Sequence, residues 1–113
     1  MSNNEYTPHK WVIVKIYGEN IKTTYKVFGC WYGGYTGSDS WQMNSGIQSA
    51  EKVGENWIFK GFSGSVYICN PGNYGLSLYC SGELEQIIER SKKEGVTVWP
   101  MHGGLDWTKF DYE

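Results

Sequence analysis

Residues 11–17 read Trp-Val-Ile-Val-Lys-Ile-Tyr and carry the first pattern of period two in the chain. Successive side chains of a β-strand point to opposite faces, so Val12, Val14 and Ile16 share one face. Trp11 and Ile13 lie on the other face. Because apolar residues occur on both faces, the pattern predicts a strand near the centre of a sheet.

Further segments rich in β-branched and aromatic residues follow, and turn residues separate them. The sequence predicts strands over 23–31, from near 41 to 53 with a bend at Gly46, and over 57–62 and 65–69. Short turns are expected at 18–20, 54–56 and 63–64, where glycine occurs. Five strands joined mostly by short turns predict an antiparallel meander.

The only helical periodicity comes late in the chain. Leu84, Ile87, Ile88 and Ser91 are spaced to share one helical face, and basic residues occupy the last turn. Gly95 is a suitable residue to end this helix. A final strand is expected over 96–99, and the aromatic tail from residue 101 should pack against the domain.

The predicted fold class is α+β, with a curved antiparallel meander sheet of five to six strands and one helix in the C-terminal half packed on a face. Residues 1–113 should form a single domain. A small oligonucleotide-binding barrel is the alternative. The expected core consists of Val12, Val14, Ile16, Val27, Ile58, Val66, Ile68, Leu84, Ile87 and Ile88.

Charge and hydropathy limit the partners. The formal net charge is −2 and the ten Lys and Arg residues are scattered, which disfavours binding of duplex nucleic acid. No segment approaches the roughly 20 apolar residues of a membrane span. The polar first residues predict a cytoplasmic protein that does not associate with a membrane.

Cysteine usage agrees with that compartment. Cys30, Cys69 and Cys80 make an odd number, so we expect three free thiols and no disulfide. Their spacing matches no zinc pattern, and His9 and His102 lie near opposite ends of the chain. We therefore expect neither a metal nor a cofactor.

Residues 31–41 read Trp-Tyr-Gly-Gly-Tyr-Thr-Gly-Ser-Asp-Ser-Trp, with four aromatic residues and three glycines. Glycine permits the backbone angles of tight loops, and loop aromatics offer flat apolar faces with polar edges. The segment predicts a binding loop, and the alternative is that its rings cover the core. The candidate site residues are Trp31, Tyr32, Tyr35, Ser38, Asp39, Trp41 and Asn44, with Tyr74 from a second loop at 70–75.

Catalytic arrangements are weaker in this sequence. Cys30 could pair with His102 as a thiol and imidazole, although a small buried residue is the simpler interpretation. Asp39 lies between two serines with no histidine near it in the sequence. No phosphate-binding loop, dinucleotide fingerprint or metalloprotease helix is present.

Three blocks, over 25–35, 39–47 and 62–69, resemble segments of small uncharacterised proteins of tailed bacteriophages and prophages. The resemblance covers the central half of the chain. It implies a phage accessory protein in the bacterial cytoplasm, of a kind that binds a host factor or sequesters a signalling nucleotide. It transfers no catalytic or binding residue.

Three function classes therefore remain open. The first is a non-catalytic protein whose loop aromatics bind a host protein. The second is a binder of a small nucleotide or sugar, stacked on the same rings and hydrogen-bonded by Ser38, Asp39 and Asn44. The third is an enzyme that uses Cys30 or Asp39. The sequence is rich in aromatic residues but has no recognisable spacing of catalytic acid and base residues, which favours binding over catalysis. The sequence does not decide between a monomer and a homo-oligomer.

Overall fold

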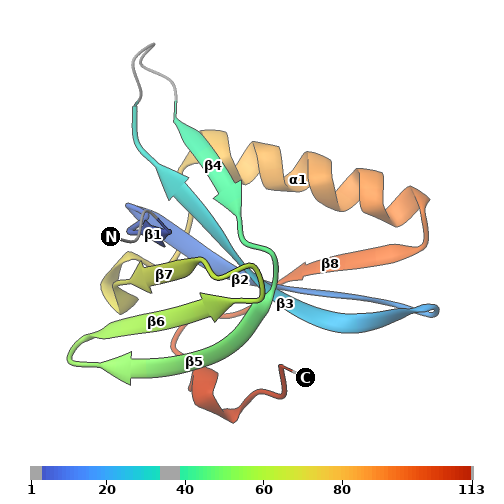
Figure 1. Cartoon of the computed structure of the whole chain (residues 1–113). Coiled ribbons are helices and arrows are strands. Elements are labelled where there is room, and N and C mark those ends of the chain that lie inside the picture. Colours follow the sequence, from blue (N-terminus) through green and yellow to red (C-terminus); the bar gives the residue numbers. More distant parts are fainter. Residues whose placement is uncertain (1–3, 34–38, 113) are drawn as a thin grey trace.

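The computed structural model describes residues 4–33 and 39–112, which form two four-stranded sheets and one α-helix (Figure 1). We call the sheet with strand order β4-β3-β2-β8 the helix-side sheet and the sheet with order β1-β7-β6-β5 the outer sheet. The elements are β1 (Glu5–Tyr6), β2 (Lys10–Gly18), β3 (Ile21–Trp31), β4 (Ser40–Met43), β5 (Ile47–Val53), β6 (Asn56–Gly61), β7 (Val66–Cys69), the 3-10 turn η1 (Pro71–Asn73), α1 (Leu78–Lys93), β8 (Val96–Pro100) and the 3-10 turn η2 (Trp107–Lys109).

The predicted α+β class is confirmed, but the prediction of one curved sheet of five to six strands is wrong. The described residues contain eight strands in two sheets. All neighbouring strands are antiparallel except β1, which pairs in parallel with β7. The two-residue strand β1 has too short a pattern to be recognised from sequence.

The two sheets separate at the bend that was expected near Gly46. β4 pairs with β3, whereas β5 pairs with β6, so one predicted strand is two strands in different sheets. Gly46 has a φ of +133°, which side chains disfavour. Asn44 is buried, and its Oδ1 accepts hydrogen bonds from Val27 N at 3.0 Å and Gly46 N at 3.3 Å. These bonds fix the corner.

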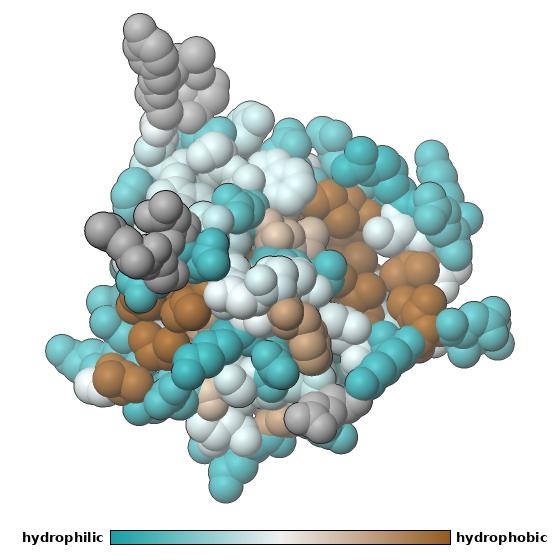
Figure 2. Space-filling view, viewed as in Figure 1, coloured by the Kyte–Doolittle hydropathy of each residue, from teal (hydrophilic) through white to brown (hydrophobic). Residues whose placement is uncertain are grey.

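The helix-side sheet lies between α1 and the outer sheet. Trp11 and Ile13 of β2 pack in the cluster shared with the outer sheet, and Val12 and Val14 pack against α1. This confirms that β2 is central. Figure 2 shows the same layering on the surface, with hydrophobic side chains gathered between α1 and β8 and hydrophilic ones along the outer side of α1.

The predicted core is only partly correct. Val12, Val14 and Leu84 are buried, with Ile16, Ile87 and Ile88 half-buried beside them, and Val27 is buried in the cluster between the two sheets. In β6 and β7, however, the inward face carries the larger residues Trp57, Phe59, Tyr67 and Cys69, all buried. Ile58, Val66 and Ile68 therefore lie on the opposite, half-buried face. Both faces of these strands are apolar, so their alternation alone did not identify the inner one.

The helix α1 begins at its N-cap Ser77, whose side chain accepts a hydrogen bond from Cys80 N at 3.2 Å. Gly95, with a φ of +78°, follows its C-cap, as predicted. The expected final strand is β8, which pairs with β2. No helix in residues 4–33 and 39–112 is long and apolar enough to cross a membrane.

The aromatic tail packs on the domain, as expected. Trp107 is 1 % exposed and belongs to the cluster between the sheets. The rings of Phe110 and Tyr112 each form a T-shaped pair with the ring of Tyr25 in β3, with centroids 5.3 and 5.6 Å apart respectively. The C-terminal segment is therefore part of the fold.

Candidate functional site

The two tryptophans of the predicted binding loop serve the core. Trp41 stacks on the buried Phe28, with ring centroids 5.1 Å apart and planes at 11°. Trp31 packs against the cluster between the sheets and meets the ring of Tyr6 edge-on. Trp31 and Trp41 therefore agree with the alternative prediction, in which the rings of this segment cover the core.

Asn44 and Tyr74 also have structural roles. Asn44 forms the corner between β4 and β5. The Tyr74 hydroxyl donates to Met101 O at 2.8 Å and accepts from Ile13 N at 3.0 Å. Burial raises the pKa of Tyr74 to about 12. Both side chains hydrogen-bond to the backbone of the fold.

Of the remaining candidates, Tyr35 and Ser38 lie outside the described residues. Tyr32 is 51 % exposed, and it is the predicted site residue that lines a cleft. The structure therefore keeps one of the predicted aromatic residues as a surface ring beside a concave site.

The cleft beside Tyr32 has a volume of about 500 Å³. Small-molecule sites commonly span roughly 300 to 1,000 Å³. The lining residues come from the segment before β2 and its first residue, the residue after β3, the start of β6, β7, and the segment that contains η1. The lining is formed by Thr7, Pro8, His9, Lys10, Tyr32, Asn56, Ile68, Asn70 and Asn73.

One wall of this cleft, the loop over 70–75, is tied to the start of β2. Trp11 Nε1 donates to Asn70 O at 2.7 Å, and Gly75 N donates to Trp11 O at 2.8 Å. Asn70 also caps η1, because its Oδ1 accepts from Gly72 N at 2.8 Å. Trp11 is 1 % exposed, so the wall is anchored to a buried residue.

His9 holds the backbone of Tyr32, another residue that lines the cleft. Its Nδ1 accepts a hydrogen bond from Tyr32 N at 2.8 Å, and its own backbone N donates to Cys30 O at 2.9 Å. The two rings lie with centroids 5.2 Å apart. Because Nδ1 accepts, the neutral imidazole carries its proton on Nε2.

The polar lining is cationic or neutral. Lys10 and His9 line the cleft, and none of the described lining residues carries a carboxylate. The Lys10 side chain lies over Gly75, where an added Cβ would be 3.4 Å from Nζ. No carboxylate is recorded within ion-pair distance of the Lys10 ammonium among the described residues.

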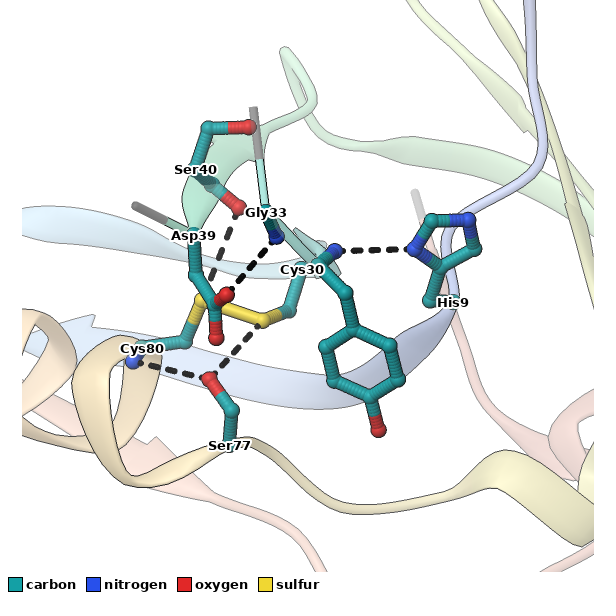
Figure 3. Close-up of a disulfide and its surroundings, with 8 residues drawn as sticks. His9, Cys30, Gly33, Asp39, Ser40, Ser77 and Cys80 are labelled. Carbon is teal, nitrogen blue, oxygen red and sulfur yellow. Dashed lines mark hydrogen bonds between the residues drawn. A yellow bond between two sulfur atoms is a disulfide. The ribbon is translucent and has the colours of Figure 1, made fainter. Parts of the chain in front are cut away.

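A second group of polar atoms surrounds a disulfide between Cys30 of β3 and Cys80 of α1 (Figure 3). The expectation of three free thiols is therefore wrong, and Cys69 is the free cysteine, fully buried. Cys30, considered as a nucleophile with His102, is bonded to Cys80. The two cysteines are 50 residues apart, and their pairing depends on how α1 docks, which spacing does not reveal.

Asp39, a predicted binding residue, lies over this disulfide (Figure 3). Its Oδ1 accepts from Gly33 N at 2.9 Å. A hydrogen bond with the Ser77 side chain, followed by the one from Gly33, holds the pKa of Asp39 below its usual value. The carboxylate thus closes the base of the loop that joins β3 to β4.

Most residues of the cleft were not identified from the sequence. Thr7 and Lys10 belong to segments with no local motif, and Asn56 belongs to a predicted turn that gave no sign of a binding site; only folding brings the three together. The 70–75 loop was recognised as a loop, but its ring, Tyr74, is structural, whereas Asn70 and Asn73 line the cleft. The usable signal was the high asparagine content of that loop.

Comparison with known proteins gave no match to a family model, to a curated protein or to a solved structure.

Proposed function

We propose that this chain is a non-catalytic binding protein whose cleft beside Tyr32 takes a small anionic ligand with a flat ring, such as a mononucleotide. The observation that carries the proposal is one exposed ring beside a concave surface that is lined by Lys10, His9 and asparagines and by no described carboxylate. An aromatic face stacks a base, and amide groups hydrogen-bond its edge or the ribose.

Charge favours an anion over a neutral sugar. The ammonium of Lys10 pairs with no described carboxylate, and a phosphate group would provide one charge-assisted partner. A phage accessory protein that sequesters a signalling nucleotide agrees with this ligand class. That setting is supported by the sequence resemblance alone.

Isothermal titration of AMP into the purified protein tests this assignment. Tyr32→Ala should weaken binding by about 5- to 160-fold, because stacking on one aromatic ring contributes roughly 1 to 3 kcal/mol. Lys10→Met should weaken it by a similar factor, since hydrogen bonds to charged groups contribute about 1.5 to 3 kcal/mol. Tyr17→Ala and Lys26→Met are the controls, because both residues lie on β2 or β3 outside the cleft.

Adenosine, inorganic phosphate and glucose complete the series of ligands. AMP should bind more tightly than each of them. Equal binding of phosphate and AMP would contradict the role of the ring, and tighter binding of glucose would favour the sugar alternative. Equal loss of affinity in the control variants would contradict the location of the site.

A protein partner is the second candidate, and one observation favours it. Leu78 is 93 % exposed and Tyr79 is 49 % exposed, both in the first turn of α1. Exposed apolar and tyrosine side chains of this kind anchor protein interfaces. If a host protein is captured from a bacterial lysate, loss of capture in Leu78→Ser but not in Tyr32→Ala would assign the interface to α1.

A further inference from the structure

The disulfide is surrounded by groups that are ordinary metal ligands. One ligand atom from each of Cys30, Asp39 and Cys80 lies within 4.8 Å of the other two. Two further oxygens are close, Ser77 Oγ at 3.3 Å from Cys30 Sγ and Ser40 O at 3.5 Å from Cys80 Sγ. Figure 3 shows these groups around the two sulfur atoms. None of them is used by the cleft beside Tyr32.

We propose that reduction of the Cys30–Cys80 disulfide creates a binding site for one thiophilic divalent cation, such as Zn²⁺, with Cys30, Cys80 and Asp39 as ligands. Two thiolates and a carboxylate are ligands that Zn²⁺ accepts in tetrahedral sites. Ser77 or Ser40 supplies a neutral oxygen near the fourth position. The site exists only in the reduced protein, because a disulfide sulfur is a poor ligand.

A dithiol reductant can supply the electrons that reduce the Cys30–Cys80 disulfide. The reductant passes two electrons and two protons to the disulfide, which gives two thiols in the protein and one disulfide in the reductant. Binding of the cation then releases the two thiol protons and forms two metal–sulfur bonds. In a tetrahedral site with Zn–S bonds of about 2.3 Å the sulfurs stand about 3.7 Å apart. The Cα atoms are 6.2 Å apart, so rotation of the two side chains provides this opening.

Both cysteines stand on regular elements, so the site is organised before a metal arrives. Cys30 lies in β3 between β2 and β4, where it pairs with Lys10 and Trp41. Cys80 is the third residue of α1, after N-cap Ser77. Helix N-termini stabilise thiolates through the macrodipole, and the thiolate is the form that binds metal.

Cobalt provides the test, because Co²⁺ bound by thiolates in a tetrahedral site has visible d–d bands and near-ultraviolet charge-transfer bands. The full chain is reduced with a phosphine, freed of reductant under argon and titrated with Co²⁺. We expect one Co²⁺ per chain in the reduced protein and none in the oxidised protein. Zn²⁺ should displace the cobalt and bleach the bands.

Variants locate the ligands. Cys30→Ser and Cys80→Ser should abolish the charge-transfer bands, whereas Cys69→Ala should keep them because Cys69 lies in the outer sheet. Asp39→Asn should weaken binding by at least about tenfold, since loss of even an outer-shell partner costs that much. Asp106→Asn is the matched control, because Asp106 also caps a local turn through Thr108 N.

Three results would overturn the proposal. They are the absence of bands in reduced protein, unchanged affinity in Asp39→Asn, and equal binding by oxidised protein. Circular dichroism recorded on the same samples covers the case in which the reduced chain unfolds. Metal binding would then have to restore the spectrum of the folded protein, and bands without refolding would show that only an unfolded chain binds.

Discussion

Tyr74 illustrates at the scale of one residue how an aromatic side chain that suggests ligand binding can instead hold the fold together. Its hydroxyl joins Ile13 N in β2 to Met101 O after β8. Tyr74→Phe leaves both backbone groups without this partner, so we expect a loss of about 1 to 3 kcal/mol in the free energy of unfolding. Urea denaturation measures it. Tyr79→Phe, at an exposed position, should change stability by less than about 0.5 kcal/mol.

The same hydroxyl predicts a dependence on alkaline pH. The pKa of Tyr74 is about 12 in the folded chain, against about 10 for an unfolded tyrosine. Because the pKa of Tyr74 is higher in the folded chain, its protonated hydroxyl contributes fully to the free energy of unfolding below about pH 10. This contribution is lost as the pH rises toward 12. Melting temperatures between these pH values should therefore fall more steeply for the wild type than for Tyr74→Phe. Parallel curves would contradict this assignment.

The cysteines give the second prediction for single residues. In denaturant without reductant, thiol titration should report one free thiol per chain, from Cys69, and three after reduction. In the folded protein Cys69 should not react, because it is fully buried and burial raises the pKa of its thiol. Three thiols before reduction would contradict the disulfide.

At the scale of elements, the turns and the helix could be predicted from sequence, but the division into two sheets could not. Hairpin turns and the helix end are local, and Gly54, Gly64 and Gly95 all have positive φ where turns were expected. The corner at Gly46 depends on a buried side chain, Asn44, that bonds to another strand. That interaction has no local signal in the sequence.

The docking of α1 is tested by two substitutions on its inner face. Leu84 is 4 % exposed and packs against the helix-side sheet, whereas Ile87 is half-buried. Leu84→Ala should cost about 2 to 5 kcal/mol, as at other buried leucines. Ile87→Ala should cost less, because less of its surface leaves water on folding. Guanidinium denaturation would contradict this docking if Ile87→Ala had the larger effect.

For the whole molecule, the disulfide connects the helix-side sheet to α1 across a sequence separation of 50 residues. The loop-closure estimate for such a link is about 4 kcal/mol. We expect reduction to lower the free energy of unfolding by about that amount in metal-free buffer. The same difference should remain in Cys69→Ala. No difference between oxidised and reduced protein would contradict a structural contribution.

The candidate site could be anticipated from sequence only in part. Tyr32 was identified because an aromatic residue beside glycines is a local feature, but Trp31 and Trp41 belong to strands whose packing uses their rings. His9 and Asn70 reach the cleft from segments 61 residues apart in the chain, through pairing that only the whole fold defines. The proposed ligand class therefore rests on the assembled surface rather than on a motif.

Ligand binding beside Tyr32 is tested directly by a titration of ¹⁵N-labelled protein with AMP, followed by amide chemical shifts. We expect saturable shifts grouped at His9, Tyr32 and Asn70, with the amides of Leu78 and Tyr79 unchanged. No shifts at millimolar AMP, or shifts confined to the first turn of α1, would contradict it.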